Sequence, residues 1–204
     1  MLKFDVGKRE HNKVMFKLNI METFLGSMAD KKLNDLNVEE VCKKIGISKV
    51  TFFNYFKSKE EVVEYFIQLW QFEMAYEINK QQLKGADVLY FLFDNVSEHP
   101  AGHSIILALV SFFIKVECYI PTQVSDYELY IYNEEAYLKG HRSVALLTLI
   151  KDAVSEFDIS DSEQEVLIKN VISGFYGIPF VFGLGFSGDL KQMYHDFLES
   201  LLPR

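Results

Sequence analysis

Cysteine, proline and glycine are scarce in this sequence of 204 residues. Its two cysteines, Cys42 and Cys118, are too few and too far apart for a disulfide framework or a four-cysteine zinc site, which favours a reducing compartment. Four prolines and eleven glycines provide few breaks for turns, so long helices are expected. The chain is 49% hydrophobic and 25% charged, which is typical of a globular protein with its own core.

Long apolar runs are also rare. We expect no signal peptide, because residues 1–9 have no apolar stretch after their charges. Residues 171–188 carry no charge over 18 positions, but they include Pro179 and five glycines. We interpret this segment as a buried or interface helix with a kink, and we expect a cytoplasmic protein without a membrane span.

The net charge of −8 hides an asymmetry along the chain. Residues 1–60 carry a net charge of +4, whereas residues 61–204 carry −12. Aromatic residues follow the opposite trend, with 7 in the first part and 23 in the second. A small basic region can meet phosphate groups locally even though the whole chain is acidic.

Apolar residues recur at helical spacing along the sequence, and no stretch alternates with period two for long, so we predict an all-α fold. The first helix is expected over about residues 13–29, and the last over about 190–201. Polar residues that favour helix starts mark several other boundaries, and Gly46 is expected to end a helix in the left-handed conformation. These expected helix caps are Asn37, Ser48, Ser58, Ser125 and Ser160.

Residues 38–56 show the pattern of a helix-turn-helix. The first helix would bury Val41, and the second would bury Phe52 and Phe56 on one face. The N-terminal residues of the second helix then stay exposed, in the arrangement that enters the major groove of DNA. The exposed set is Lys49, Val50, Thr51, Phe53 and Asn54. A simple helical corner with a solvated basic face is the alternative.

The longer string around this pattern resembles the N-terminal DNA-binding domain of the TetR (tetracycline-repressor-like) family. The resemblance covers about residues 13–66, and its most specific part is the run from Ser48 through Tyr55-Phe56 to Lys57-Ser-Lys-Glu-Glu61. It implies a three-helix helix-turn-helix domain in residues 1–57, which we call the head, with residues 1–12 as a possible arm. A larger helical effector-binding and dimerisation domain would follow in residues 58–204, which we call the body.

The sequence departs from the family pattern at four positions of the head. Lys32 stands where the family usually has glycine, and Val50 where it usually has glycine or another small residue. Phe53 stands where it usually has tyrosine, and Asn37 stands near a usual threonine, a change that preserves capping. Phe53 therefore lacks a hydroxyl group that contacts phosphate. DNA binding is still expected, but an operator sequence cannot be transferred from other members.

The resemblance also implies roles for particular residues of the head. Lys49 and Asn54 are expected at base edges or phosphates, and Lys59 at a phosphate. Phosphate contacts make binding salt-dependent, so Lys59→Ala is expected to weaken all DNA binding and lower the salt slope by about one unit. The complete expected set of DNA-binding residues is Lys17, Asn37, Lys49, Val50, Thr51, Phe53, Asn54, Lys57 and Lys59.

The body is expected to hold a small-molecule effector. Residues 104–114 are apolar all round and should be central in the body, and the resemblance implies a pocket there for an apolar or aromatic molecule. Glu117 would instead suit a cationic effector. His99 and His103 are four residues apart, but no third ligand accompanies them, so we expect no metal and no cofactor. The candidate effector residues are Trp70, Phe91, His103, Phe112, Phe113, Glu117, Tyr137 and Phe175.

Residues 141–157 and 162–186 are expected to form a homodimer interface, since a two-fold protein matches a palindromic operator. The resulting hypothesis is a TetR-like repressor that a small effector releases from double-stranded DNA. One alternative is a helical adaptor that binds protein without specific DNA binding. An all-α enzyme is a second alternative, although the sequence contains no recognised catalytic or phosphate-binding motif, and we expect no enzymatic activity.

Overall fold

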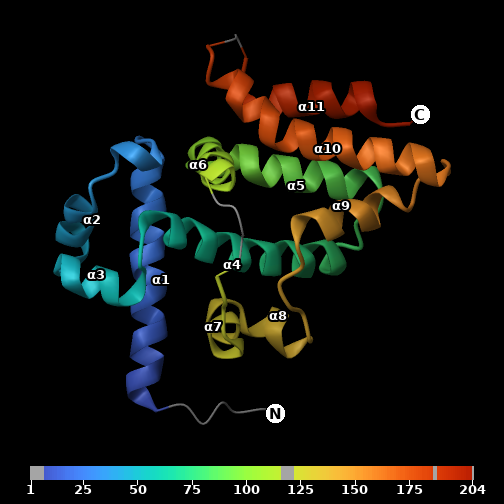
Figure 1. The fold of residues 1–204 in the computed structure, drawn as a ribbon. Coiled ribbons are helices and arrows are strands. Elements are labelled where there is room, and N and C mark those ends of the chain that lie inside the picture. Colours follow the sequence, from blue (N-terminus) through green and yellow to red (C-terminus); the bar gives the residue numbers. More distant parts are fainter. Residues whose placement is uncertain (1–6, 116–121, 186–187, 204) are drawn as a thin grey trace.

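The structure, a computed structural model, describes residues 7–115, 122–185 and 188–203. In these residues it contains eleven α-helices, one short 3-10 turn and no strand, which confirms the all-α prediction (Figure 1). The elements are α1 (Lys8–Met28), η1 (Leu33–Asp35), α2 (Val38–Ile45), α3 (Lys49–Tyr55), α4 (Lys59–Lys80), α5 (Ala86–Glu98), α6 (Gly102–Lys115), α7 (Asp126–Tyr132), α8 (Glu134–Leu138), α9 (Leu146–Val154), α10 (Asp161–Phe182) and α11 (Leu190–Leu201).

Helix α1 is longer than the sequence pattern predicted. It begins at Lys8 rather than near residue 13, so residues 8–12 are helical and only residues 1–6 of the proposed arm lie outside the described part. The added turns extend beyond α2 and α3 toward α7 (Figure 1). There the His11 Nδ1 atom lies 2.9 Å from the Tyr127 hydroxyl. The additional N-terminal residues of α1 therefore contact α7 of the body.

The predicted helix starts are confirmed by their caps. Asn37, Ser48 and Ser58 each accept a hydrogen bond from a backbone N–H two or three residues ahead. Ser125 and Ser160 form complete capping boxes, each with the glutamate three residues later. The left-handed φ of +77° at Gly46 also agrees with the prediction, since glycine adopts this conformation without a Cβ penalty.

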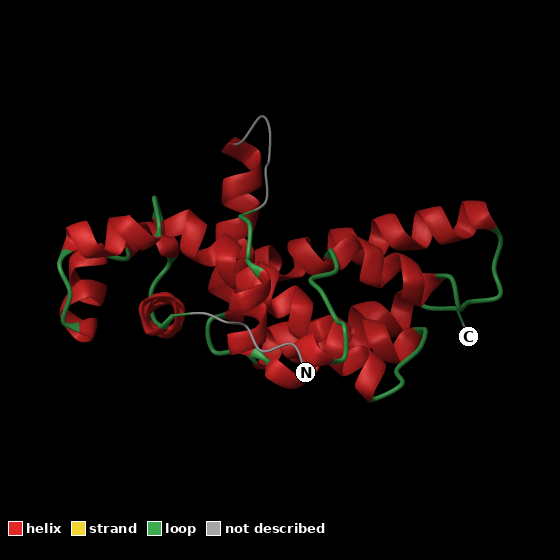
Figure 2. Ribbon diagram, turned by 90° about the horizontal axis from the view of Figure 1, so that it is seen from below, coloured by secondary structure: helices red, strands yellow, loops and turns green. Residues whose placement is uncertain are grey.

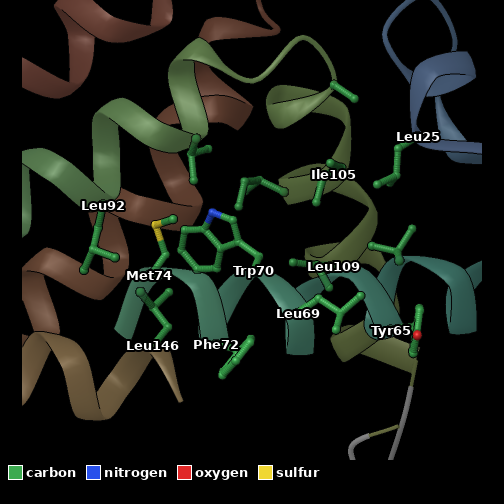
Figure 3. Close-up of a cluster of buried hydrophobic side chains, with 14 of the residues drawn as sticks. Leu25, Tyr65, Leu69, Trp70, Phe72, Met74, Leu92, Ile105, Leu109 and Leu146 are labelled. Carbon is green, nitrogen blue, oxygen red and sulfur yellow. The ribbon is translucent and has the colours of Figure 1, made fainter. Parts of the chain in front are cut away.

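Helix α4 connects the head to the body. It starts beside α3 and passes below α6 and α5, with α10 and α11 stacked beyond them and α7 and α8 on its other side (Figure 1). Seen from below, the head and the body lie at opposite ends of an elongated molecule (Figure 2). Trp70 lies near the middle of α4, among Met74, Leu146, Ile105 and Leu109 (Figure 3). Helix α4 thus contributes buried residues next to both the head and the rest of the body, within one continuous hydrophobic core.

Aromatic side chains join α5, α10 and α11. The rings of Phe93 and Phe175 lie 5.2 Å apart between centroids, and those of Phe93 and Tyr194 lie 4.7 Å apart, both in edge-to-face geometry. The buried Tyr194 hydroxyl donates a hydrogen bond to the Phe175 carbonyl at 2.8 Å. These contacts fix the inner face of α10, because edge-to-face pairs add to the stabilisation from apolar burial.

The two segments predicted to form a dimer interface differ in how far they are buried within their own chain. Helix α9 buries Leu146, Leu149 and Ile150 within its own chain and packs against α5 and α10. The apolar stripe of α9 thus packs within its own chain, and an interface over residues 141–157 stays a prediction. In contrast, 28% of the most apolar 18-residue window of α10 is buried, and this helix is long and apolar enough to cross a membrane by length and composition. The helix continues through Pro179 to Phe182.

Candidate nucleic-acid interface

A broad groove of about 610 Å³ opens beside α3 in the head. Its lining combines residues from the η1–α2 link, from α3 and from the start of α4. It includes five of the nine residues that the sequence pattern assigned to DNA, namely Asn37, Lys49, Phe53, Lys57 and Lys59. The fold therefore gathers most of the predicted DNA-binding set around one surface.

The buried face of α3 determines which residues this surface presents. Phe52 is fully buried, with its ring 6.3 Å from that of Phe24 in α1 and 6.1 Å from that of Phe56. Since this face is held by the core of the head, the opposite face points outward. Val50 is 71% exposed and Phe53 is 48% exposed. An exposed face beginning at the helix N-terminus is the arrangement in which a recognition helix enters the major groove.

Lys49 is held by an ion pair within the helix-turn-helix. Its Nζ atom lies 2.5 Å from the Glu39 Oε1 atom, and both side chains are about half exposed. The hydrogen bond and charge of Lys49 hold the pKa of the Glu39 carboxyl below its usual value. Exposed pairs of this kind contribute little stability and are screened by salt. Lys49 can therefore exchange Glu39 for a DNA phosphate at small cost.

Thr51 and Asn54 occupy different environments on α3. The Thr51 hydroxyl lies 2.9 Å from the Ser48 hydroxyl, within the cap of the helix. Asn54 is exposed one turn further along, on the same side as Val50. Asn54 is thus the better placed of the two for a base edge, whereas Thr51 supports the start of α3.

The Lys59 ammonium group is bonded to backbone carbonyls of the head, whereas the resemblance implied a contact with phosphate. Its Nζ atom donates to the carbonyls of Leu33, Asn34 and Leu36 at 2.7, 3.2 and 3.1 Å. An ammonium group has three donors, and these three bonds use all of them. These bonds favour a structural role in which Lys59 fastens the start of α4 to η1, and its phosphate contact stays an untested prediction.

We expect Lys59→Met to lower the free energy of unfolding by about 1.5–3 kcal/mol, the usual range for hydrogen bonds to a charged group. The salt dependence of DNA binding should keep its slope, because no phosphate contact is removed. Urea denaturation and DNA titrations at several salt concentrations measure the two effects. Lys57→Met is the matched control, since Lys57 is exposed in the same groove. That control should lower the salt slope and leave stability unchanged; a lower slope in Lys59→Met would support the phosphate role.

Lys17 is also turned away from the groove. Its Nζ atom lies 2.8 Å from the Glu128 Oε1 atom in α7 and 3.9 Å from the centre of the Tyr65 ring. The Lys17 side chain is only 17% exposed, and that of Glu128 is 10% exposed. In the structure this side chain ties the first helix of the head to the body, and its contact with DNA stays an untested prediction.

The body contains a second candidate site, a small cavity of about 30 Å³ around Trp70. The Trp70 Nε1–H donates to the Asn95 Oδ1 atom at 2.5 Å. His99 accepts the Ala101 N–H through Nδ1 at 3.1 Å, and burial lowers the pKa of its ring, so it is neutral at pH 7. The residues that line this cavity are Phe66, Ile67, Trp70, Gln71, Asn95, Val96, His99, Gly102, Ile105, Ile106, Leu109, Leu146, Phe175 and Tyr176.

Only two of the predicted effector residues, Trp70 and Phe175, line this cavity. The His103 Nε2 atom instead lies 2.9 Å from the Pro179 carbonyl oxygen, and Phe112 lines a separate hollow between α6 and the head. Tyr137 packs under the Arg142 guanidinium at 4.3 Å. Phe91 and Phe113 do not line the cavity either, and Glu117 lies outside the described residues.

The sequence reasoning missed several residues of the cavity. Phe66 and Ile67 belong to the apolar stripe of α4 that includes Trp70, so their spacing carried a usable signal. Asn95 and His99 carried no such signal, because a polar residue near the end of α5 is usually exposed. Their position follows from the way α4, α5 and α6 pack together.

Comparison with known proteins agrees with this geometry. Residues 25–66 match the sequence model for bacterial regulatory proteins of the tetR family. The fold is similar to that of GusR from Salmonella enterica, with a TM-score of 0.54 and 14% identity, over 91% of this chain and 90% of that chain. No curated protein sequence matches the chain.

The helical fold and the exposed face of α3 define a helix-turn-helix DNA-binding protein. More particularly, residues 25–66 are similar to the DNA-binding domain of the tetR family of bacterial regulatory proteins, in agreement with the predicted resemblance. This match supports a role in the regulation of transcription.

Proposed function

We propose that this protein is a cytoplasmic homodimeric repressor that binds a palindromic operator and leaves it when a small apolar or aromatic effector enters the body. The exposed face of α3 beside its groove is the single observation that carries DNA binding. In this proposal the protein is a regulator without catalytic activity. The adaptor alternative gains no support from the body, whereas the tetR-family match favours DNA as the partner of the head.

Helix α10 supports the dimer. Its outward side presents Val166 at 58% exposure and Phe180 at 61%, and Leu184 just beyond the helix is 63% exposed. A Cβ added at Gly177 on α10 meets no atom within 4 Å, so another backbone can approach closely there. Exposed large apolar residues gather at the end of α10 and just beyond it, at Phe180, Val181 and Leu184, and an apolar cluster of this kind favours an interaction surface. We assign this one to a second copy, whose two-fold symmetry would place two α3 helices about 34–36 Å apart on one side of DNA.

The cavity around Trp70 supports an uncharged effector. Its lining residues include no lysine, arginine, aspartate or glutamate. A volume of about 30 Å³ is too small for an aromatic ring, so a ligand must push α4, α6 or α10 apart. Because α4 also begins beside α3, this movement would change the spacing of the two heads. An effector that binds the wider form better shifts the population away from the DNA-bound form.

The first test is a mobility shift with DNA that flanks the gene of this protein, at two salt concentrations and with nonspecific competitor. A specific, salt-sensitive shift is expected, and Lys49→Ala combined with Asn54→Ala should abolish it. Lys151→Ala is the control, because it removes one exposed positive charge on α9, far from α3. Equal binding by both variants, or no specific shift on any DNA selected from a random pool, would refute the proposal.

A further inference from the structure

The outward face of α3 is unusually apolar for a surface that meets a charged polymer. Val50 is 71% exposed and Phe53 is 48% exposed, although both are large hydrophobic residues. Phe52 and Phe56 are fully buried in the core of the head, whereas Phe53 lies at its border, with its ring 5.3 Å from that of Phe52 between centroids. Val50 and Phe53 are three residues apart, so they are neighbours on one side of the helix.

The positive groups that usually read guanine are scarce on the same face. The sequence contains no arginine between Arg9 and Arg142, so α2 and α3 offer no guanidinium fork for guanine O6 and N7. Lys49 is the one lysine on α3, and its Nζ atom is paired with Glu39. The amide of Asn54, which is exposed beside Val50, matches adenine, because it can bond N6 and N7 together.

We propose that α3 reads A·T base pairs, with Val50 and Phe53 against thymine methyl groups and Asn54 on an adjacent adenine. The inference rests on the proposed DNA-binding function and specifies which bases the operator presents to this face. Among the four bases, only thymine has a methyl group in the major groove, and apolar side chains are its usual partners. In this proposal Val50 and Phe53, two of the positions that depart from the family pattern, determine the base specificity.

Replacement of thymine by deoxyuridine tests this inference, because it removes one methyl group and no hydrogen-bonding atom. The operator is first selected from random DNA with the full-length protein, and each thymine of a half-site is then replaced in turn. One buried methyl group is worth about 0.8 kcal/mol, so affinity should fall about fourfold at each thymine facing Val50 or Phe53. Deoxyuridine outside the half-sites is the matched control.

Two protein variants test whether Val50 and Phe53 cause the loss of affinity on deoxyuridine DNA. Val50→Ala and Phe53→Ala change exposed side chains, so both variants should fold normally. Each should bind the thymine operator several-fold more weakly and lose its sensitivity to deoxyuridine at one position. Near-ultraviolet circular dichroism checks that the head is intact.

The possible results separate the two proposals. Specific binding with less than twofold change at every deoxyuridine would overturn the thymine readout and leave the DNA-binding function standing. G·C pairs at the selected positions facing α3, or unchanged affinity in both variants, would overturn it as well. Failure to select any specific DNA would refute the proposed function itself, and the apolar face of α3 would then be assigned to a protein partner.

Discussion

Replacing Phe175 by alanine is expected to lower the free energy of unfolding by about 3–5 kcal/mol, the range for removing a buried phenylalanine. Phe175 is only 2% exposed and contacts the rings of Phe93 and Trp70, at centroid distances of 5.2 and 6.4 Å. It therefore joins α10 to α5 and α4. Its removal loses the apolar contacts and leaves a cavity that the neighbouring helices close only in part. Urea denaturation, followed by circular dichroism, measures the loss.

Phe180→Ala on the same helix is the control, because Phe180 is 61% exposed in the single chain. The decrease in the free energy of unfolding caused by Phe175→Ala should be the same at low and high protein concentration. The Phe180→Ala variant should match the wild type when the chains are dissociated and be less stable only at concentrations that favour the dimer. Equal losses in both variants at all concentrations would contradict the assignment of an inner and an outer face to α10.

Replacing Lys17 by methionine is expected to lower the free energy of unfolding at pH 7 by on the order of 3 kcal/mol. Lys17 and Glu128 form a largely buried ion pair at 2.8 Å, with side chains that are 17% and 10% exposed. Methionine preserves most of the side-chain volume but leaves the Glu128 carboxylate without its counter-charge. The Ser125 hydroxyl and backbone N–H still bond to Glu128, so the loss comes mainly from the missing charge.

The pH dependence of this loss follows from the pKa of Glu128. Burial raises the pKa, but the hydrogen bonds and charge of Lys17 and the bonds from Ser125 outweigh burial and lower it overall. A carboxyl group with a lowered pKa stabilises the fold above its unfolded pKa, and this stability disappears as the pH falls through the folded pKa. Without Lys17, burial dominates and the pKa of Glu128 rises. The wild type should therefore lose its advantage over Lys17→Met as the pH falls from 7 toward 4.

Denaturation of the wild type, Lys17→Met, Glu128→Gln and the double variant at both pH values measures the coupling as a double-mutant cycle. The double variant should be more stable at pH 7 than Lys17→Met alone. Lys13→Met is the matched control, since Lys13 is on the same helix, is 61% exposed and lies 3.6 Å from Glu10. A loss that is independent of pH, or as large in Lys13→Met, would refute a special role for the buried pair.

The local features of this protein were determined by the sequence itself. The caps at Asn37, Ser48 and Ser58, the left-handed Gly46 and the final helix were all predicted correctly, because each depends on residues within a few positions. The helix-turn-helix was also predictable, since its exposed Val50 and buried Phe52 lie two positions apart, on opposite sides of one short helix. The same local pattern carried the resemblance to the TetR family.

Contacts between distant segments were decided only by the tertiary structure. Lys17 meets a glutamate 111 residues away, and Lys59 meets carbonyls 23 to 26 residues away, so no local pattern separates these lysines from ones that face DNA. Helices α9 and α10 are both rich in apolar residues, yet one is covered by its own chain and the other is largely uncovered. Helix periodicity determines which residues share a face, but the packing of the other helices determines what that face meets.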